Sequence, residues 1–352
     1  MSHAIIIPIY CENRNTINLC NELQNFGAEH IVVVNDGLNP KSEYFNELTS
    51  IGCHLVHLKN NNGKGASLKA GIKYAHDNLY NITGFITCDA DGQHTANDVM
   101  KISRMLDLRN GSLILGKRDY KKSKMPINIR IGNRLSSAYF KVITGKSCSD
   151  TQTGLRGIPA FLYDTVMKTK GSRFDFEMNF LTKCADMRVP FYFVNIIADC
   201  SNCSSNFRLI KDTYLIYRTP LRFATASIGC TIIDLVLFTI FAYILPSHMF
   251  FNIMLATLMA RVVSGGINFL INRKVIFGNT DNGAKQALRF FILFFCIMCA
   301  SSLIALWFLP IPVTLTKAIV DLLLWTVNYK MQRIWVFKDS NRIKRTPGSK
   351  RK

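Results

Sequence analysis

Four long apolar runs in the second half of this 352-residue chain constrain its fold more than any other feature. They cover residues 221–245, 249–271, 286–309 and 313–329, and each is near the ~20 residues that a helix needs to cross a bilayer. The alternative, a succession of four buried core helices, is a poor explanation for apolar runs of this length. The sequence therefore predicts an all-α transmembrane domain of four helices over residues 213–338.

The charged residues indicate how such a domain lies in a membrane. The formal net charge is +20, and residues 246–248 and 310–312, which join the runs in pairs, contain neither Lys nor Arg. The positive-inside rule then places both termini, and the domain before the first run, on the cytoplasmic side of a multi-pass integral membrane protein. Nucleic acid is another partner for a basic chain, but the apolar runs favour the lipid bilayer, and we expect no nucleic-acid partner. The basic tail, residues 339–352, is expected to lie on anionic headgroups.

The membrane half also contains an internal repeat. Residues 268–277 echo residues 328–337, and residues 221–223 echo residues 288–290. Because a repeated segment indicates a repeated structural unit, we expect the four runs to form two related hairpins.

Four ionisable residues fall within the predicted spans: Asp234, Arg261, Lys317 and Asp321. Unpaired charges are costly inside a bilayer, so Arg261 is expected to pair with Asp234 or Asp321 and to hold the helices together. A role of these residues in the passage of a lipid is the alternative.

Residues 1–212 have a different pattern, in which short apolar runs alternate with amphipathic helical patterns. The runs that are typical of buried parallel strands cover residues 4–10, 31–34, 54–58, 84–88 and 112–116. Helical patterns between them include one through Ile17 and Leu23 and one with Leu68, Ile72 and Ala75 on one face. This alternation predicts an α/β domain with a mostly parallel, doubly wound, Rossmann-like sheet.

Two carboxylates directly follow the fourth predicted strand. Asp89 and Asp91 lie one residue apart, and Gln93 is close behind them. Ligands of α/β sheets bind at the carboxyl ends of the strands, and two carboxylates with an amide oxygen suit Mg²⁺ or Mn²⁺. A solvated turn is the alternative, because Asp and Gly are common in turns.

Polar residues also follow the other predicted strands. Tyr10 and Glu12 follow the first strand, Asp36 the second and Lys64 the third. If the strands are parallel, these groups meet at one edge of the sheet and suit a nucleotide with a metal ion on its diphosphate. The spacing around Lys64 is not that of a Walker A motif, and the dinucleotide fingerprint is absent.

Cysteines give little functional information. The chain has 11, and Cys200 with Cys203 forms a CxxC pair. One such pair without histidine partners is weak evidence for zinc, so reduced cytosolic thiols are the better interpretation.

Several of these segments resemble family 2 glycosyltransferases of the GT-A fold, and more closely the polyprenyl-phosphate sugar synthases of the dolichyl-phosphate mannose synthase type. The resemblance rests on residues 8–12, 34–37, 62–65 and, most specifically, the string Asp-Ala-Asp-Gly-Gln-His at residues 89–94. The membrane half is similar to the GtrA-like family of four-span proteins that accompany such synthases. Together these resemblances cover nearly the whole chain.

The resemblance implies a donor site and a metal site. The residues implied around the donor nucleotide are Pro8, Tyr10, Glu12, Asp36, Lys64, Asp89, Ala90, Asp91, Arg208 and Lys211. The residues implied around Mg²⁺ or Mn²⁺ are Asp89, Asp91 and Gln93. Two positions depart from the family pattern. Asn35 stands where an acidic residue is frequent, and Asn206 replaces a usual lysine, so the diphosphate contact would pass to Arg208 or Lys211.

The resemblance also implies an acceptor site. Arg118, Arg130 and Arg134 are expected to hold a lipid phosphate, whose oxygens match the guanidinium fork. Arg130 and Arg134 lie one helical turn apart and share a face, although at least one of the three arginines is expected to be an ordinary surface residue. The sugar and acceptor site is expected to include Asp150, Gln152 and Glu177, and the catalytic residues are expected to be Asp89, Asp91 and Arg118.

These resemblances imply a membrane-bound inverting glycosyltransferase. It would move one sugar from a nucleotide sugar of the GDP-mannose or UDP-glucose type to a polyprenyl phosphate, either dolichyl or undecaprenyl phosphate. A phosphate monoester is already anionic at neutral pH, so the attack on the anomeric carbon needs no strong general base. The metal ion and Arg208 or Lys211 would stabilise the leaving diphosphate.

Two other functions fit parts of the sequence. The first is a lipid-linked sugar translocator or scaffold whose GT-A domain only binds. The second is a processive polysaccharide synthase, which is disfavoured because residues 332–335 lack the Gln-x-x-Arg-Trp spacing of that class.

Overall fold

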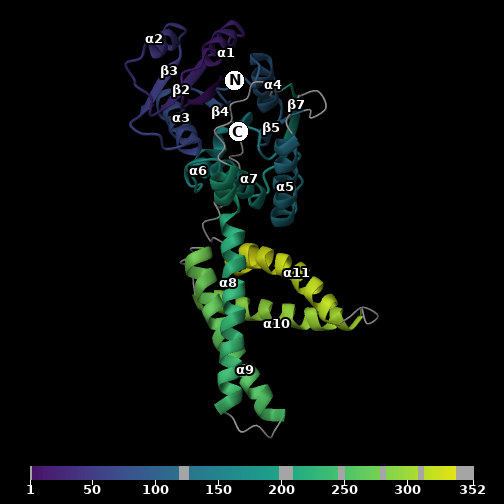
Figure 1. Ribbon diagram of the computed structural model, residues 1–352. Helices are drawn as coiled ribbons and strands as arrows, with labels where there is room; N and C mark the ends of the chain where they lie inside the picture. The colour runs from purple at the N-terminus through teal and green to yellow at the C-terminus, as the bar shows by residue number, and fades with distance from the viewer. Residues whose placement is uncertain are drawn as a thin grey trace, which may run out of the picture. The chain divides into compact units, whose positions relative to one another are not determined.

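The computed structural model describes residues 2–118, 127–197, 209–244, 250–277, 283–307 and 313–337 (Figure 1). The chain divides into two compact units, Met1–Ile216 and Tyr217–Lys352, which we call unit 1 and unit 2. Each unit is described by itself.

Unit 1 contains a seven-stranded sheet in the order β3-β2-β1-β4-β6-β5-β7. The strands are β1 (Ser2–Ile9), β2 (His30–Asp36), β3 (His54–Leu58), β4 (Ile82–Thr87), β5 (Leu113–Arg118), β6 (Arg156–Pro159) and β7 (Phe191–Ile196). Every neighbouring pair is parallel except that β6 runs antiparallel to both β4 and β5. The predicted mostly parallel α/β fold is therefore confirmed, and the structure adds β6 and β7, which were not predicted.

The helices of unit 1 cover both faces of this sheet (Figure 1). They are α1 (Arg14–Asn25), α2 (Glu43–Ser50), α3 (Lys64–Asn78), α4 (Ala96–Leu108), α5 (Ile127–Thr144), α6 (Tyr163–Met167) and α7 (Asp175–Asp186), with a short 3₁₀ turn at Ala160–Leu162. The two predicted helical patterns are confirmed as α1 and α3, whose apolar faces are buried.

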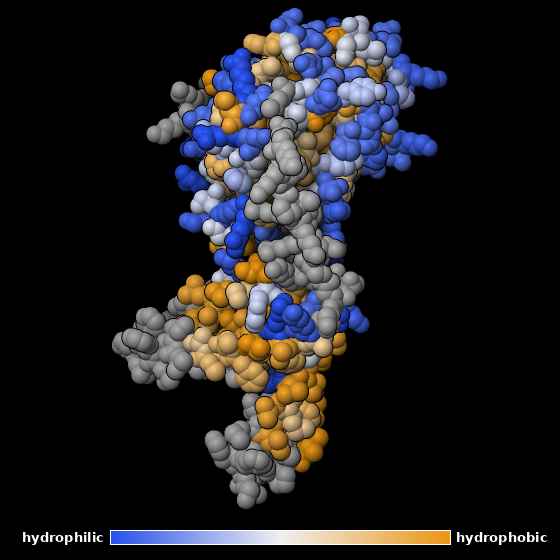
Figure 2. Space-filling model, turned by 180° about the vertical axis from the view of Figure 1, so that it is seen from behind, coloured by the Kyte–Doolittle hydropathy of each residue, from blue (hydrophilic) through white to orange (hydrophobic). Residues whose placement is uncertain are grey.

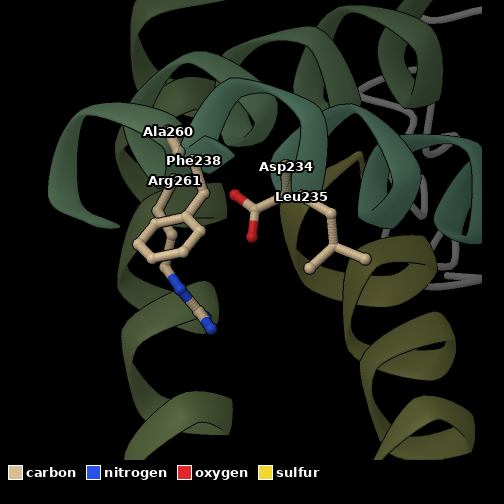
Figure 3. A pocket seen from close by; sticks show the side chains of 5 residues that line it. All are labelled: Asp234, Leu235, Phe238, Ala260 and Arg261. Carbon is tan, nitrogen blue, oxygen red and sulfur yellow. The ribbon is translucent and has the colours of Figure 1, made fainter. Parts of the chain in front are cut away.

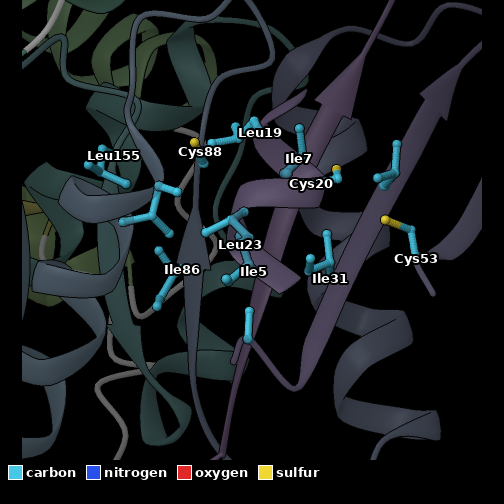
Figure 4. Packing of buried hydrophobic residues seen from close by; sticks show 14 of the residues in the cluster. Ile5, Ile7, Leu19, Cys20, Leu23, Ile31, Cys53, Ile86, Cys88 and Leu155 are labelled. Atoms are coloured by element: carbon cyan, nitrogen blue, oxygen red, sulfur yellow. The ribbon is translucent and has the colours of Figure 1, made fainter. Parts of the chain in front are cut away.

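Two hydrophobic cores form because side chains alternate along each strand. Ile5 and Ile7 of β1 point into one core with residues of α1, as Figure 4 shows. The same core includes residues of α2 and α4. Ile6 of the same strand points into the other core with residues of α3 and α7. The sheet is thus packed on both faces.

Unit 2 consists of helices where the apolar runs predicted them. They are α8 (Leu209–Ile244), α9 (Phe250–Ile271), α10 (Gly283–Trp307) and α11 (Val313–Met331). Within the part of the chain that the structure describes, one segment, Leu221–Phe241 of α8, is long and apolar enough to cross a bilayer. Figure 2 shows hydrophobic side chains gathered over the surface of these helices, and large apolar residues such as Leu235 and Val262 are exposed on them.

The predicted repeat has a structural counterpart in unit 2. Each repeat ends in a π-helical turn, Asn272–Ile276 after α9 and Gln332–Val336 after α11. Asn272 lies 60 residues before Gln332, the residue at the same place in the second repeat, and donates a 3.0 Å hydrogen bond to its amide oxygen. Both side chains are almost fully buried.

Aromatic rings repeat the same relationship around this amide pair. Phe277 and Phe337 hold equivalent positions and stack at 4.9 Å between ring centroids. Phe277 also lies 6.3 Å from Tyr329, and Phe337 lies 5.9 Å from Phe269, the equivalent ring. We call these rings together with Asn272 and Gln332 the repeat seam. The paired contacts confirm that the two repeats are related units packed against each other.

Candidate functional site

Asp36 fixes the loop that leads into α3. Its Oδ1 accepts a hydrogen bond from the backbone N–H of Asn62 at 2.8 Å, and its Oδ2 accepts one from Gly63 at 2.9 Å. Gly63 has a φ of +93°, and a Cβ there would lie 2.8 Å from the side chain of Arg173. Because φ in this region favours glycine, the loop geometry requires the residue present, and Asp36 sets where α3 begins.

Asp89 lies directly beyond β4 and contacts Lys64 at the start of α3. The Lys64 Nζ is 2.6 Å from Asp89 Oδ1, and the buried His94 has its Nε2 3.8 Å from Asp89 Oδ2. Gly154 packs so closely against this carboxylate that a Cβ there would overlap Oδ2. Burial alone raises the pKa of Asp89, but Lys64 and His94 outweigh it and hold the pKa well below its usual range.

Asp91 has a different environment from Asp89. Its carboxylate accepts hydrogen bonds from the backbone N–H of Gln93, at 3.1 Å, and from the side-chain amide of Gln93. Burial and the negative charge of Asp89 raise the pKa of Asp91. Burial, the neighbouring Cys11 and the charge of Asp91 raise the pKa of Tyr10 at the end of β1. Tyr10 therefore lies within electrostatic range of Asp91 and Asp89, in keeping with the expectation that the ends of parallel strands meet at one edge.

The residues proposed to hold a metal ion supply oxygen atoms of the right kind. Asp89 and Asp91 are carboxylates one residue apart in the chain, and Gln93 donates to Asp91 through its backbone N–H and its side-chain amide. A divalent cation would counter the burial and the repulsion from Asp89 that raise the pKa of Asp91, and hard cations prefer such ligands. Over the described residues there is no cluster of three His, Cys, Asp or Glu side chains placed to bind a metal ion. The set proposed here has two carboxylates and one amide, so it differs in composition from such a cluster.

Lys64 contacts a second carboxylate, which belongs to α7. Its Nζ is 3.2 Å from Glu177 Oε1, and Arg156 Nη2 lies 3.8 Å from the same oxygen. Burial lowers the pKa of Lys64, but Asp89 and Glu177 outweigh it and raise the pKa. This link between α3 and α7 was not predicted. Glu177 and Lys64 were each named as site residues, but nothing in a sequence pairs residues this far apart.

Arg118 and Asp150 form a buried bidentate pair. Arg118 Nε donates to Asp150 Oδ2 at 2.7 Å and Nη2 donates to Oδ1 at 2.8 Å. Arg118 is 7% exposed and Asp150 is fully buried. The backbone N–H of Gln152 also donates to Asp150 Oδ1, at 3.3 Å. Arg118, predicted to hold the acceptor phosphate, therefore lies together with Asp150 and Gln152, which were both predicted for the sugar and acceptor site.

The other two predicted acceptor arginines lie on α5, Arg130 half-buried and Arg134 exposed. Between them, Asn133 is buried, and its Oδ1 accepts a hydrogen bond from the backbone N–H of Thr151 at 3.2 Å. Asn133 also donates to the carbonyl of Ser149 at 3.3 Å. It thus connects α5 to the loop that carries Asp150. A polar residue on the buried face of an amphipathic helix is the sequence feature that could have indicated this role.

Three of the remaining predicted donor residues are described by the structure. Pro8 is buried within β1, Glu12 is exposed, and Ala90 is half-buried with its carbonyl accepting a hydrogen bond from Thr16 at 3.0 Å. Arg208 and the side chain of Lys211 lie outside the described residues. Their diphosphate contact therefore stays a prediction.

Unit 2 has a polar cluster between α8 and α9. Ser264 donates a hydrogen bond to the Asp234 carboxylate at 2.7 Å. Asp234 and Arg261 also line one cavity of about 220 Å³, together with Leu235, Phe238 and Ala260 (Figure 3). Arg261 and Asp234 thus line the same cavity, while the pairing of Arg261 with Asp234 or Asp321 stays a prediction. The side chains of Lys317 and Asp321 lie outside the described residues.

Two family models match the chain, one for each half. Residues 4–164 match glycosyl transferase family 2, and residues 222–337 match the GtrA/DPMS transmembrane domain.

Curated archaeal relatives match the first half of the chain. An uncharacterized protein of Methanocaldococcus jannaschii is 32% identical over 188 residues, which are 50% of this chain and 73% of that protein. The UDP-N-acetylglucosamine–dolichyl-phosphate N-acetylglucosaminyltransferase of Methanococcus voltae is 29% identical over 172 residues, which are 43% of this chain and 67% of that protein.

Solved structures include glucosyl-3-phosphoglycerate synthase from Mycobacterium tuberculosis in complex with Mn²⁺, UDP-glucose and phosphoglyceric acid. It is 11% identical, with a TM-score of 0.48, over 63% of this chain and 77% of that chain.

Proposed function

Because this chain belongs to the family 2 glycosyltransferases and carries a GtrA/DPMS transmembrane domain, we propose that it transfers one sugar from a nucleotide sugar to a polyprenyl phosphate. The observation that carries the proposal is the group at the end of β4, where Lys64 contacts Asp89 and Gln93 donates two hydrogen bonds to Asp91. These residues come from the ends of different strands or from the loop after them. That is where α/β domains bind nucleotides.

The donor would bind at this edge of the sheet. Asp89, Asp91 and Gln93 would hold Mg²⁺ or Mn²⁺, which supplies positive charge to the diphosphate when it is bound. Lys64 would add a second positive charge from the first turn of α3. Tyr10, Glu12 and Asp36, at or just beyond the ends of β1 and β2, would lie around the nucleoside.

The reaction would be a single displacement with inversion at the anomeric carbon. A phosphate oxygen of the lipid forms a bond to that carbon as the bond from the carbon to the nucleoside diphosphate breaks. The electron pair of the broken bond leaves with the diphosphate, and no proton has to be removed from the attacking phosphate. The chain therefore needs cationic groups for the leaving group and the acceptor rather than a strong base.

Arginines would hold the acceptor. Arg130 and Arg134 on α5 are accessible and match the oxygens of a phosphate. Arg118 already forms a bidentate pair with Asp150, and the backbone N–H of Gln152 donates to the same carboxylate. These three residues would therefore form a rigid wall of the acceptor site. The sugar would lie between this wall and Asp89.

The membrane domain would keep the enzyme at its lipid substrate. We propose that α8, α9, α10 and α11 all cross the bilayer and that unit 1, both termini and the basic tail lie on the cytoplasmic side, where nucleotide sugars are found. The lack of Lys and Arg in residues 246–248 and 310–312 supports this orientation.

The sugar and the lipid can be identified in one experiment. Membranes that contain the chain are incubated with Mn²⁺, one polyprenyl phosphate and one labelled donor at a time: UDP-glucose, GDP-mannose or UDP-N-acetylglucosamine. The third donor is included because the Methanococcus voltae relative is named for it. We expect one donor to give a label extractable with the lipid. If no donor does so with dolichyl or undecaprenyl phosphate, the proposal is wrong. A translocator would instead move a preformed lipid-linked sugar.

A further inference from the structure

Four charged side chains of alternating sign lie in a row inside unit 1. We call them the charge row: Arg156, Glu177, Lys64 and Asp89. Successive members are 3.8, 3.2 and 2.6 Å apart between their nearest nitrogen and oxygen atoms. They come from β6, α7, the start of α3 and the segment after β4. The row therefore connects Lys64 and Asp89, two predicted donor residues, with β6 and α7. This connection was not predicted from the sequence.

One end of the charge row is rigid. Arg156 is 2% exposed, and its guanidinium donates to the backbone carbonyls of Thr153, Glu177 and Thr151 at 2.9, 3.0 and 3.2 Å. These bonds fix the first turn of α7 to the loop before β6. They involve the backbone of Glu177 and leave its carboxylate for other partners.

The carboxylate of Glu177 is buried between two cations. The residue is 6% exposed, and its Oε1 faces Arg156 on one side and Lys64 on the other. A buried carboxylate is costly unless it is paired, so this position needs a specific explanation. Since the backbone bonds already hold α7, the side chain is not required to attach the helix.

Lys64 is the adaptable member of the row. An ammonium group has three donors on a flexible stem. Among the described residues, Asp89 and Glu177 are its carboxylate partners. If Asp89 were its sole carboxylate partner, Lys64 would neutralise that group fully. Sharing the lysine with Glu177 leaves Asp89 more of its negative charge and holds the ammonium in one place.

We propose that Glu177 is a positioning residue for the donor site, which holds Lys64 between two carboxylates so that its ammonium faces the donor's diphosphate and Asp89 keeps its charge. The proposal rests on the proposed function for the identity of the ligand. Glu177 acts through Lys64 and has no contact of its own with the donor. This differs from the direct sugar or acceptor contact that the family resemblance implies for Glu177.

A double-mutant cycle tests this dependence. The variants are Glu177→Gln, Lys64→Met and the two together. Glu177→Gln keeps the size of the side chain and the backbone bond to Arg156. Asp186→Asn, at the far end of α7, is the matched control, because it removes a carboxylate from the same helix.

The measured quantity is the dissociation constant for radiolabelled UDP and for GDP, each with Mn²⁺, by equilibrium dialysis of the full chain in detergent. Glu177→Gln is expected to weaken binding of the preferred nucleotide by roughly tenfold or more, as expected for a lost charge-assisted contact. Lys64→Met is expected to weaken it by at least as much. The double variant should then bind no more weakly than Lys64→Met, because residues that act through one another are not additive.

Other results would overturn the proposal. Wild-type nucleotide affinity in Glu177→Gln would do so. So would a double variant whose loss of affinity equals the product of the two single losses, because a purely structural glutamate would give that result. Where transfer is measurable, a change in the KM of the acceptor instead of the donor would also overturn it. If the wild-type chain binds neither nucleotide, both proposals fail, whereas binding without a lipid-linked product overturns the proposed function alone.

Discussion

The side-chain amide of Asn272 donates a hydrogen bond to the amide oxygen of Gln332, its counterpart in the second repeat. Each of the two also donates to the asparagine four residues before it, Asn272 to Asn268 at 2.7 Å and Gln332 to Asn328 at 3.1 Å. A buried amide pair surrounded by stacked rings joins the two hairpins at equivalent points. Polar bonds of this kind specify one packing of two apolar hairpins, because apolar contacts alone do not select a register.

Asn272→Leu is expected to destabilise unit 2. The change leaves the buried amide oxygen of Gln332 without its donor, which costs about 1–3 kcal/mol. The measurement is thermal unfolding of the purified chain in detergent. Thr239→Val is the control, because Thr239 is exposed on α8 and its hydroxyl bonds only within its own helix. An equal melting temperature for Asn272→Leu and the wild-type chain would contradict the role given to the repeat seam.

Gly154→Ala is expected to reduce sugar transfer while the chain stays folded. A methyl group at residue 154 would overlap the Asp89 carboxylate, so Asp89 must move away from its position at Lys64. Misplacement of a site residue by about an ångström can cost about a hundredfold in rate. Steady-state transfer measures the effect. Gly132→Ala serves as the control, since a Cβ there meets nothing within 4 Å. Equal rates for the two variants would show that the placement of Asp89 does not matter.

Much of unit 1 was predictable because its strands are continuous apolar runs and its helices have clear apolar faces. β6 was missed because it is only four residues long and pairs antiparallel between strands distant in sequence. β7 was missed because it lies at the edge of the sheet and is only half-buried, so its pattern is weak.

The site was predictable in its parts but not in its connections. The ends of parallel strands placed Tyr10 near Asp89 and Asp91, as topology requires. The contacts of Glu177 with Lys64 and of Arg118 with Asp150 depend on tertiary packing of α7 and of the loop before β6. No periodicity or local spacing reports such packing. The same holds for the repeat, whose echo was visible in the sequence while the contact between Asn272 and Gln332 was not.

Asp150→Asn is expected to destabilise unit 1 and to disturb the acceptor site. The change removes the charge that balances the buried Arg118 guanidinium, and breaking a buried pair costs about 3–5 kcal/mol. Thermal unfolding should therefore begin at a lower temperature than in Asp164→Asn, whose carboxylate is largely exposed. A matching stability of both variants would mean that the pair contributes little.

Removal of divalent cations is expected to stop transfer reversibly. EDTA should abolish formation of the lipid-linked product, and added Mn²⁺ or Mg²⁺ should restore it, because Asp89, Asp91 and Gln93 are proposed to hold the cation. Gln93→Ala should then need a higher metal concentration for half-maximal rate than the wild-type chain, since one oxygen ligand is lost. Full activity in EDTA, after dialysis against the chelator, would exclude a metal-dependent donor site.

The most direct test of the central claim compares the wild-type chain with Asp91→Asn in the transfer of label from the nucleotide sugar to polyprenyl phosphate. Asparagine keeps the shape of the side chain and removes the charge proposed to hold the metal ion and the donor. The account predicts a lipid-extractable label with the wild-type chain and a loss of roughly a hundredfold or more with Asp91→Asn, consistent with electrostatic stabilisation as a large part of catalysis. Equal labelling by the two proteins would contradict it.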